Sequence, residues 1–129
     1  MAKRILIIDD EGLVTKSLKK LLAKAGYEVE VAASGTEALE IFKKLDFDLV
    51  VSDVRMPQMD GIETIERLRQ LQKELNKPAP KEIFITGYAD EASYNRALKL
   101  KVCDYIFKPF DISQFIAAIK KNLGDKDEA

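Results

Sequence analysis

Short runs of apolar residues alternate along the chain with segments in which apolar residues recur at helical spacing. The runs cover residues 5–8, 29–33, 49–51, 83–85 and 105–107, the second of them weaker and alternating in character. Solid apolar runs of this length are typical of strands that are buried on both faces, as in a parallel sheet. The pattern therefore predicts five β-strands.

An amphipathic helical pattern follows each of these runs. The first helix is expected to carry Val14, Leu18, Leu21, Leu22 and Ala25 and to end before Gly26, a common C-terminal cap. Polar residues that favour helix N-termini precede the other four patterns, and they are Ser34, Asp60, Asp90 and Asp111. Ser34 and Glu37 also have the spacing of a capping box. Five strand–helix units predict the α/β fold class, a doubly wound parallel sheet with helices on both faces.

Several weaker features complete the predicted organisation. Residues 72–81, which contain Asn76, Pro78 and Pro80, are expected to form a longer loop. The fourth helix has a weak pattern that rests on Ala92, Ala97 and Leu98. A chain of 129 residues is the length of one domain, which we expect to span residues 1–124 and to leave a charged tail at 125–129.

Composition excludes several classes of function. The net charge is −1, so we expect no direct nucleic-acid binding, and no apolar run is long enough for a membrane span or a signal peptide. Cys103 is the single cysteine, which predicts a reducing, cytoplasmic location and a buried, unreactive side chain. The chain has no histidine, which rules out Ser-His-Asp catalysis, Cys-His catalysis and His-ligated zinc.

Polar side chains end four of the five predicted strands. Asp9 and Asp10 follow the first, Ser52 and Asp53 end the third, Thr86 ends the fourth and Lys108 ends the fifth. In open α/β sheets, ligands bind at this carboxyl edge of the strands. Each residue alone has an ordinary explanation as a helix cap, a strand residue or a surface charge. Together they form a set that phosphoryl transfer to a carboxylate requires: crowded acids that need a divalent cation, a lysine for an anionic group, and a hydroxyl.

With these residues at its strand ends, the chain resembles the response-regulator receiver domains of two-component signalling, including the stand-alone chemotaxis type. The resemblance extends from about Lys3 to Leu123. It rests on four motifs, in this order: Ile-Leu-Ile-Ile-Asp-Asp-Glu, Leu-Val-Val-Ser-Asp-Val-Arg-Met-Pro-Gln-Met-Asp-Gly, Ile-Thr-Gly-Tyr and Asp-Tyr-Ile-Phe-Lys-Pro-Phe. Membership of this family implies the flavodoxin-like strand order 2-1-3-4-5.

The resemblance also implies roles for individual residues. Asp53 is expected to accept the phosphoryl group. Asp10 and the backbone carbonyl of Arg55 are expected to bind Mg²⁺, for which Mn²⁺ or Ca²⁺ could substitute, and Asp9 to orient a water on the metal. Lys108 and Thr86 are expected to contact phosphoryl oxygens, and the Lys108–Pro109 peptide is expected to be cis.

Two further roles concern signalling and its duration. Tyr105 stands where the family places its switch aromatic, which moves into the space that Thr86 leaves when Thr86 approaches the phosphoryl group; an ordinary strand aromatic is the alternative. Arg55 and Tyr88 lie two residues beyond Asp53 and Thr86, and we hypothesise that they set the access of water to the acyl phosphate.

The expected partners follow from the same resemblance. Since the chain has no histidine, a sensor histidine kinase, a phosphotransfer protein or a small acyl phosphate must supply the phosphoryl group. The donor is expected near Leu13 and Val14, and the output surface between about Asp90 and Lys121. We expect a monomer or transient homodimer that controls a protein target or a further linked domain, and no enzyme activity beyond its own phosphorylation and autodephosphorylation.

Three other functions are compatible with parts of this sequence. A phosphatase of the haloacid dehalogenase type needs a second Asp two residues after its nucleophile, where this chain has Arg55, and its nucleophile follows the first strand. A degenerate receiver that acts as a scaffold tends to lack an acidic residue, the lysine or the acceptor, and this chain has them all. A flavin-binding module of the same fold class has a phosphate loop rich in Ser and Thr, whereas Asp9, Asp10 and Glu11 would repel a phosphate.

Overall fold

The computed structural model describes residues 2–87 and 91–124, apart from the side chain of Leu13. Its strands are β1 (Arg4–Ile8), β2 (Glu28–Ala32), β3 (Leu49–Asp53), β4 (Lys81–Gly87) and β5 (Asp104–Lys108). Its helices are α1 (Gly12–Lys24), α2 (Gly35–Lys44), α3 (Gly61–Glu74), α4 (Glu91–Leu98) and α5 (Ile112–Leu123). Among the described residues, no helix is long and apolar enough to cross a membrane.

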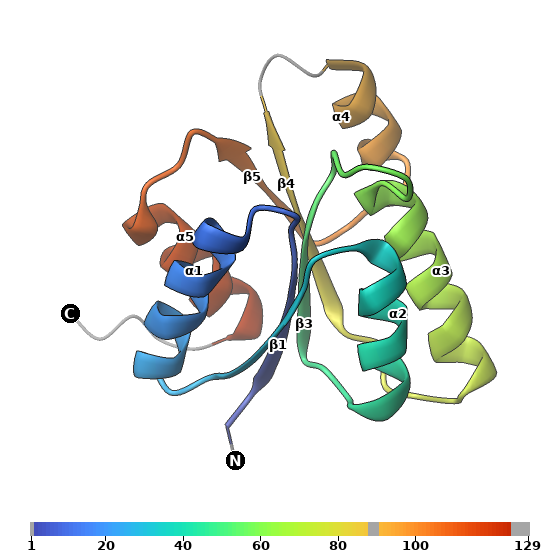
Figure 1. The fold of residues 1–129 in the computed structure, drawn as a ribbon, viewed down its shortest axis with the longest axis horizontal. Coiled ribbons are helices and arrows are strands. Elements are labelled where there is room, and N and C mark those ends of the chain that lie inside the picture. The colour runs from blue at the N-terminus through green and yellow to red at the C-terminus, as the bar shows by residue number, and fades with distance from the viewer. Residues whose placement is uncertain (1, 88–90, 125–129) are drawn as a thin grey trace.

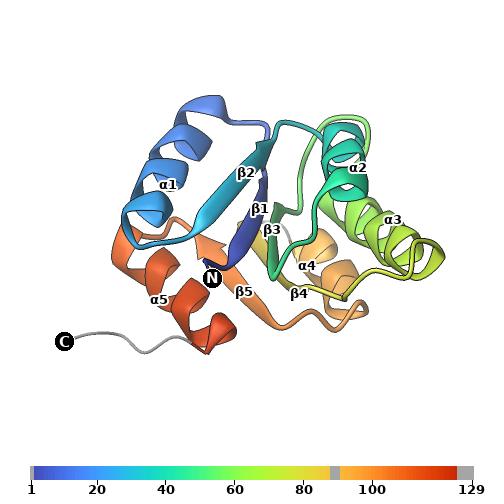
Figure 2. The ribbon, with the colours of Figure 1, turned by 90° about the horizontal axis from the view of Figure 1, so that it is seen from below.

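The strands form one parallel sheet in the order β2-β1-β3-β4-β5. Helices α1 and α5 cover one face, and α2, α3 and α4 cover the other (Figures 1 and 2). This arrangement confirms the predicted fold class and strand order. Because the chain direction across the sheet reverses at β1 and β3, the carboxyl ends of these neighbouring strands flank the switch point where ligands bind in such folds.

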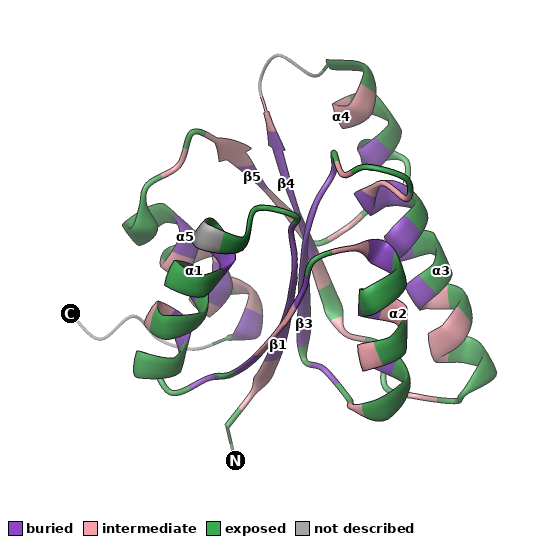
Figure 3. Ribbon diagram, in the orientation of Figure 1, coloured by how far each residue is buried: buried purple, intermediate pink, exposed green. Residues whose placement is uncertain are grey.

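The central strands are buried on both faces (Figure 3), as their unbroken apolar runs predict. Alternate residues of β1 enter two separate cores. Ile5 and Ile7 pack with α1 and α5, whereas Leu6 and Ile8 pack with α2 and α3. All five residues of β3 are buried, so the packing around this strand holds its last residue, Asp53, in place.

The helix ends agree well with the sequence. Side-chain oxygens of Ser34, Asp60 and Asp111 accept hydrogen bonds from backbone N–H groups three residues later, as N-caps do. Gly26 has a φ of +97°, the left-handed conformation that favours glycine after a helix. The expected cap Asp90 and the predicted tail 125–129 lie outside the described residues.

Three expectations were wrong in detail. The predicted loop at 72–81 is shorter, because α3 continues through Glu74 and β4 begins at Lys81. Only Ala97 of the three apolar residues predicted for the fourth helix is buried, and Leu98 is 42% exposed. Cys103 is exposed rather than buried, because it lies in the turn before β5 and not within the strand.

A close contact ties α3 to the end of β3. The backbone N–H of Gly61 donates to the carbonyl of Val54 at 2.9 Å. A Cβ atom at Gly61 would lie 2.0 Å from the carbonyl oxygen of Asp53, a distance that real Cβ atoms essentially never show. Glycine is therefore required here because the first turn of α3 lies directly against the Asp53 backbone.

We predict that Gly61→Ala lowers the free energy of unfolding by about 2 kcal/mol or more, since the methyl group must displace backbone atoms. Urea denaturation measures this loss. Gly12→Ala is the matched control, because a Cβ there meets nothing within 4 Å, and we expect it to be neutral or stabilising. Similar stability changes in the two variants would contradict this account.

Candidate functional site

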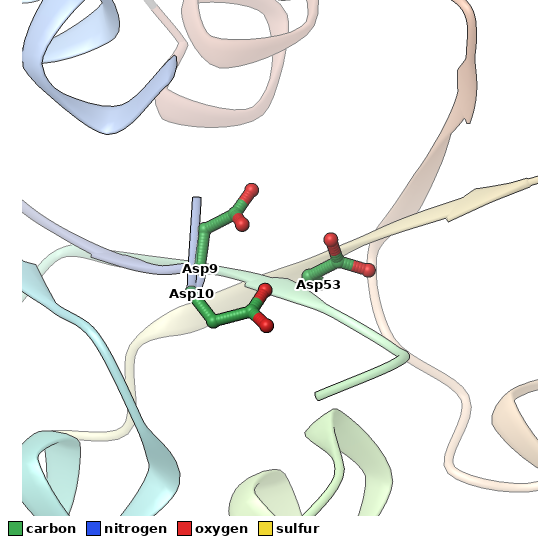
Figure 4. A group of neighbouring side chains, drawn as sticks. All are labelled: Asp9, Asp10 and Asp53. Atoms are coloured by element: carbon green, nitrogen blue, oxygen red, sulfur yellow. The ribbon is translucent and has the colours of Figure 1, made fainter. Parts of the chain in front are cut away.

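The ends of β1 and β3 bring three carboxylates together. Asp9 and Asp10 follow β1, and Asp53 is the last residue of β3. One oxygen from each of the three side chains lies within 4.8 Å of the others. Figure 4 shows the three carboxylates around a common space. The structure thus unites the acids that the sequence placed at two different strand ends.

The three carboxylates differ in their exposure to water. Asp9 is 3% exposed and Asp53 is 4% exposed, whereas Asp10 is exposed. Burial, with a smaller contribution from the negative charge of Asp53, raises the pKa of Asp9 from 3.8 to about 6, against the lowering effect of a hydrogen bond from the backbone N–H of Glu11. The cluster therefore holds its buried negative charge at a cost in free energy.

Lys108 is the positive charge in contact with this cluster. Its Nζ donates to Oδ2 of Asp53 at 2.5 Å. Burial disfavours the charged ammonium group, but the hydrogen bond and the charges of Asp53 and Asp9 outweigh this effect and raise the pKa of Lys108. The other oxygen, Oδ1 of Asp53, accepts from the backbone N–H of Arg55 at 3.2 Å. Both oxygens of Asp53 are held, so the carboxylate has a fixed orientation.

The arrangement of the acids fits a small divalent cation. Mg²⁺ binds oxygen ligands at about 2.0–2.1 Å in an octahedron, so two ligand atoms lie roughly 3.0–4.2 Å apart. Oxygens within 4.8 Å of one another need only a small contraction to meet this requirement. A cation would also offset the two effects that raise the pKa of Asp9, its burial and the negative charge of Asp53.

Thr86 lies near the end of β4, the neighbour of β3. Thr86 is 2% exposed, and its hydroxyl oxygen has no hydrogen-bond partner among the described residues. Leaving a buried hydroxyl unpaired costs about 1–3 kcal/mol. A buried hydroxyl without a partner at the carboxyl edge of the sheet can donate a hydrogen bond to a ligand oxygen, such as that of a phosphoryl group.

Tyr105 lies on β5 beside β4, where it is paired with Phe84 in the strand register. Its ring is half-buried and packs against the core that contains Phe84, with ring centroids 6.5 Å apart. Its hydroxyl donates a long hydrogen bond of 3.4 Å to the carbonyl of Ala97. Tyr105 is therefore held between the sheet and α4 by weak contacts.

Of the two residues predicted to control access of water, the structure describes Arg55 but not Tyr88. Arg55 is exposed and lies just after β3, beside the acid cluster in sequence. Tyr88 lies outside the described residues. The Lys108–Pro109 peptide is cis, as the family resemblance implied.

A groove leads from the acid cluster to α1. Its lining includes Asp9, Glu11, Val14, Gly87, Lys108, Pro109 and Phe110. The sequence pointed to Val14 but not to Phe110, which lies after the cis peptide and forms a wall of the groove. At about 670 Å³ the groove is large enough to accept side chains of a partner.

Another hollow lies at the opposite edge of the sheet, between α3 and the start of β4. Its floor is formed by Phe42, Val50 and Leu68. Arg69 and Glu82 at its rim bind each other, with Nη2 to Oε1 at 2.5 Å. Because Arg69 and Glu82 are paired with each other, they are not available to bind a charged ligand in this hollow. The candidate functional site is therefore the edge of the sheet that carries Asp53.

We predict that Asp9→Asn stabilises the metal-free protein at pH 7.5. The folded-state pKa of Asp9 is raised from 3.8 to about 6, so its contribution to stability is fully present below pH 3.8 and is lost as the pH rises through 6. Asparagine removes this loss, which we expect to be about 2–3 kcal/mol. Urea denaturation at pH 4 and pH 7.5 measures it.

The exposed neighbour provides the control for that measurement. Asp10→Asn should show a smaller gain, since its carboxylate keeps its hydration in the folded state. An Asp9→Asn difference from the parent that is the same at both pH values would refute the assignment of the buried charge to Asp9.

Comparison with known proteins is consistent with this geometry. The sequence profile of the family described as "Response regulator receiver domain" matches residues 5–120. The chain is 37% identical to the chemotaxis protein CheY of Thermotoga maritima over 94% of this chain and 98% of that protein. It is 36% identical to the regulatory protein AtoC of Escherichia coli over 93% of this chain but only 25% of that protein.

A solved structure shows the same fold. The CheY-like response regulator receiver domain protein of Methanospirillum hungatei superposes with a TM-score of 0.84 at 34% identity, covering 96% of this chain and 95% of that one. The match of family, fold and motifs extends over nearly the whole chain. This protein belongs to the response-regulator receiver domain family of two-component signal transduction.

Proposed function

We propose that this chain is a signalling switch in which Asp53 accepts a phosphoryl group and Lys108, Thr86 and a Mg²⁺ ion stabilise it. Receiver domains are phosphorylation-based switches rather than enzymes acting on a separate substrate, and they take phosphoryl groups from histidine kinases. The observation that carries the proposal for these residues is the contact between Lys108 and Asp53 inside a cluster of three carboxylates. A buried acid at the end of a rigid strand, held by two hydrogen bonds, is suited to act as a nucleophile.

The proposed reaction is nucleophilic transfer at phosphorus. A carboxylate oxygen of Asp53 attacks the phosphorus of a donor phosphohistidine; the new O–P bond forms, the N–P bond breaks, and the imidazole leaves with the electron pair. The product is an acyl phosphate, which water later hydrolyses to regenerate the carboxylate and release inorganic phosphate. The Lys108 ammonium group is paired with Asp53 in this structure. After the transfer it would instead bind an oxygen of the phosphoryl group and stabilise its negative charge.

The residues that would hold the metal are Asp9, Asp10, Asp53 and the backbone carbonyl of Arg55. The ion supplies charge neutralisation for the transferred phosphoryl group. The donor set is made entirely of oxygens, which favours Mg²⁺, with Mn²⁺ or Ca²⁺ as substitutes.

The donor and the target are proposed to use different surfaces. The groove beside α1, with Val14 and Phe110 on its walls, opens directly onto Lys108 and Asp9 and suits a phosphohistidine-bearing protein. The surface formed by α4, β5 and α5 carries the half-exposed Leu98 and Ile112 and suits a target protein, a linked domain or a second copy in a transient dimer. A cytoplasmic location remains a prediction from the single cysteine.

Incubation with acetyl phosphate and Mg²⁺, followed by intact mass measurement, tests the core proposal. We expect the mass to rise by one phosphoryl group in the parent, and we expect no rise in Asp53→Ala or after chelation of the metal. Asp48→Ala, which changes an acid at the opposite end of the strand, is the control that should keep the mass gain. If neither acetyl phosphate nor a cognate kinase labels the parent, the chain would be better described as a phosphorylation-independent scaffold.

The same measurement followed over time tests the proposed role of Arg55 and Tyr88. If their side chains control access of water, Arg55→Ala and Tyr88→Ala should change the rate at which the added mass is lost by roughly severalfold, equivalent to about 1 kcal/mol. Unchanged rates in both variants would remove these two residues from the proposal.

A further inference from the structure

Helix α4 is attached to the rest of the fold by few contacts. It is eight residues long, and Ala97 is its only buried residue. Elements with little buried surface open and shift most easily. The position of α4 therefore depends strongly on individual side-chain contacts. Two of these connect α4 to Tyr105 and to the start of α3.

The first contact is aromatic. The ring of Tyr94 on α4 meets the ring of Tyr105 edge-on, with centroids 5.5 Å apart, and lies 5.4 Å from the ring of Phe107. Tyr105 and Phe107 are two residues apart on β5 and project from the same face of the strand. Tyr94 thus packs on the proposed switch residue and, at the same time, on an aromatic neighbour in the same strand.

The second contact is ionic. Nη1 of Arg96 on α4 lies 3.3 Å from Oδ2 of Asp60. Asp60 caps α3 through its other oxygen, Oδ1, which accepts from the N–H of Glu63 at 2.9 Å. The next residue, Gly61, lies against the backbone of Asp53. Arg96 therefore links α4 to the helix that is packed directly on the proposed phosphoacceptor.

We propose that Tyr94 and Arg96 are positioning residues that hold α4 in the unphosphorylated arrangement. We call these two contacts, Tyr94–Tyr105 and Arg96–Asp60, the α4 clasp. The inference rests on the proposed function, because it assigns the clasp to the resting state of that switch. When Tyr105 moves toward the space near Thr86, its ring leaves Tyr94, and α4 loses one of the two contacts of the clasp.

The clasp has a measurable thermodynamic consequence. Contacts that are present only in the resting state stabilise that state, so phosphorylation must overcome them. When the binding-competent state is a small fraction of molecules, weakening the resting state by a given factor raises the apparent affinity for a phosphoryl group by about the same factor. Clasp variants should therefore bind a phosphoryl analogue more tightly than the parent does.

The test uses beryllium fluoride as a non-transferable phosphoryl analogue, titrated in the presence of Mg²⁺ and followed by ¹⁹F NMR. Arg96→Gln should lower the apparent Kd by roughly two- to fivefold, the range expected for loss of an exposed ion pair. Tyr94→Ala should lower it by roughly two- to tenfold, the range for an aromatic pair. Arg96 is an exposed side chain, so its variant is expected to fold even if Tyr94→Ala does not.

The pair and its controls make the test specific. Asp60→Asn removes the charge but keeps a side-chain oxygen that can cap α3, so it should reproduce the Arg96→Gln shift, and the double variant should add nothing further. Tyr94→Phe keeps the ring and should match the parent. Arg67→Gln removes an exposed ion pair within α3, with Glu63 at 3.9 Å, and should also match the parent.

The outcomes separate this inference from the function on which it rests. Tighter binding in Arg96→Gln, Asp60→Asn and Tyr94→Ala, but not in the controls, supports the clasp. Binding that is abolished by Asp53→Asn but unchanged in the clasp variants overturns the clasp and leaves the proposed function standing. A parent that binds no analogue, or binds it independently of Asp53, overturns both.

Discussion

The repulsion among three carboxylates at one edge of the sheet is the interaction on which the rest of the site depends. Asp9, Asp10 and Asp53 offer oxygens within 4.8 Å of one another, and two of these residues are almost completely buried. Such an arrangement is unfavourable by itself: burial first, and the negative charge of Asp53 second, raise the pKa of Asp9 to about 6. Lys108 compensates part of the charge through its hydrogen bond to Asp53. A bound cation would compensate the remainder, so the electrostatic cost of the metal-free site favours the cation, and the cation together with Lys108 would offset the negative charge of a phosphoryl group.

The fold maintains this unfavourable arrangement by burying the strand that carries the proposed acceptor. All of β3 is buried, and the first turn of α3 lies so close to Asp53 that only glycine fits at position 61. The residues proposed to move lie elsewhere, on β4 and β5. There the buried hydroxyl of Thr86 has no hydrogen-bond partner within the described part of the chain, and Tyr105 is held between the sheet and the weakly attached α4. A buried, well-held Asp53 as the proposed acceptor, beside a loosely held Tyr105 as the proposed readout, is a physical basis for converting a local charge event into a surface change.

Much of this could be predicted from the sequence because it depends on local rules. Unbroken apolar runs gave the buried strands, the residues after them gave the acid cluster and Lys108, and the N-caps Ser34, Asp60 and Asp111 were identified from residue type. The predictions that failed depend on tertiary contacts. The pattern at α4 rested on Ala92, Ala97 and Leu98, but of these only Ala97 is buried, and α4 also docks through Tyr94 and Arg96, whose partners lie in other elements. Likewise, the raised pKa of Asp9 and the exposure of Cys103 depend on what the folded chain places around them.

The central claim is that Asp53, and not a neighbouring acid, is the nucleophile. The most direct test is to treat the protein with acetyl phosphate and Mg²⁺, reduce the acyl phosphate with borohydride, and locate the altered residue by peptide mass spectrometry. The account predicts a reduced side chain at Asp53 alone, because only this carboxylate is held by both Lys108 and the backbone N–H of Arg55. Reduction at Asp9 or Asp10, with Asp53 unchanged, would contradict it.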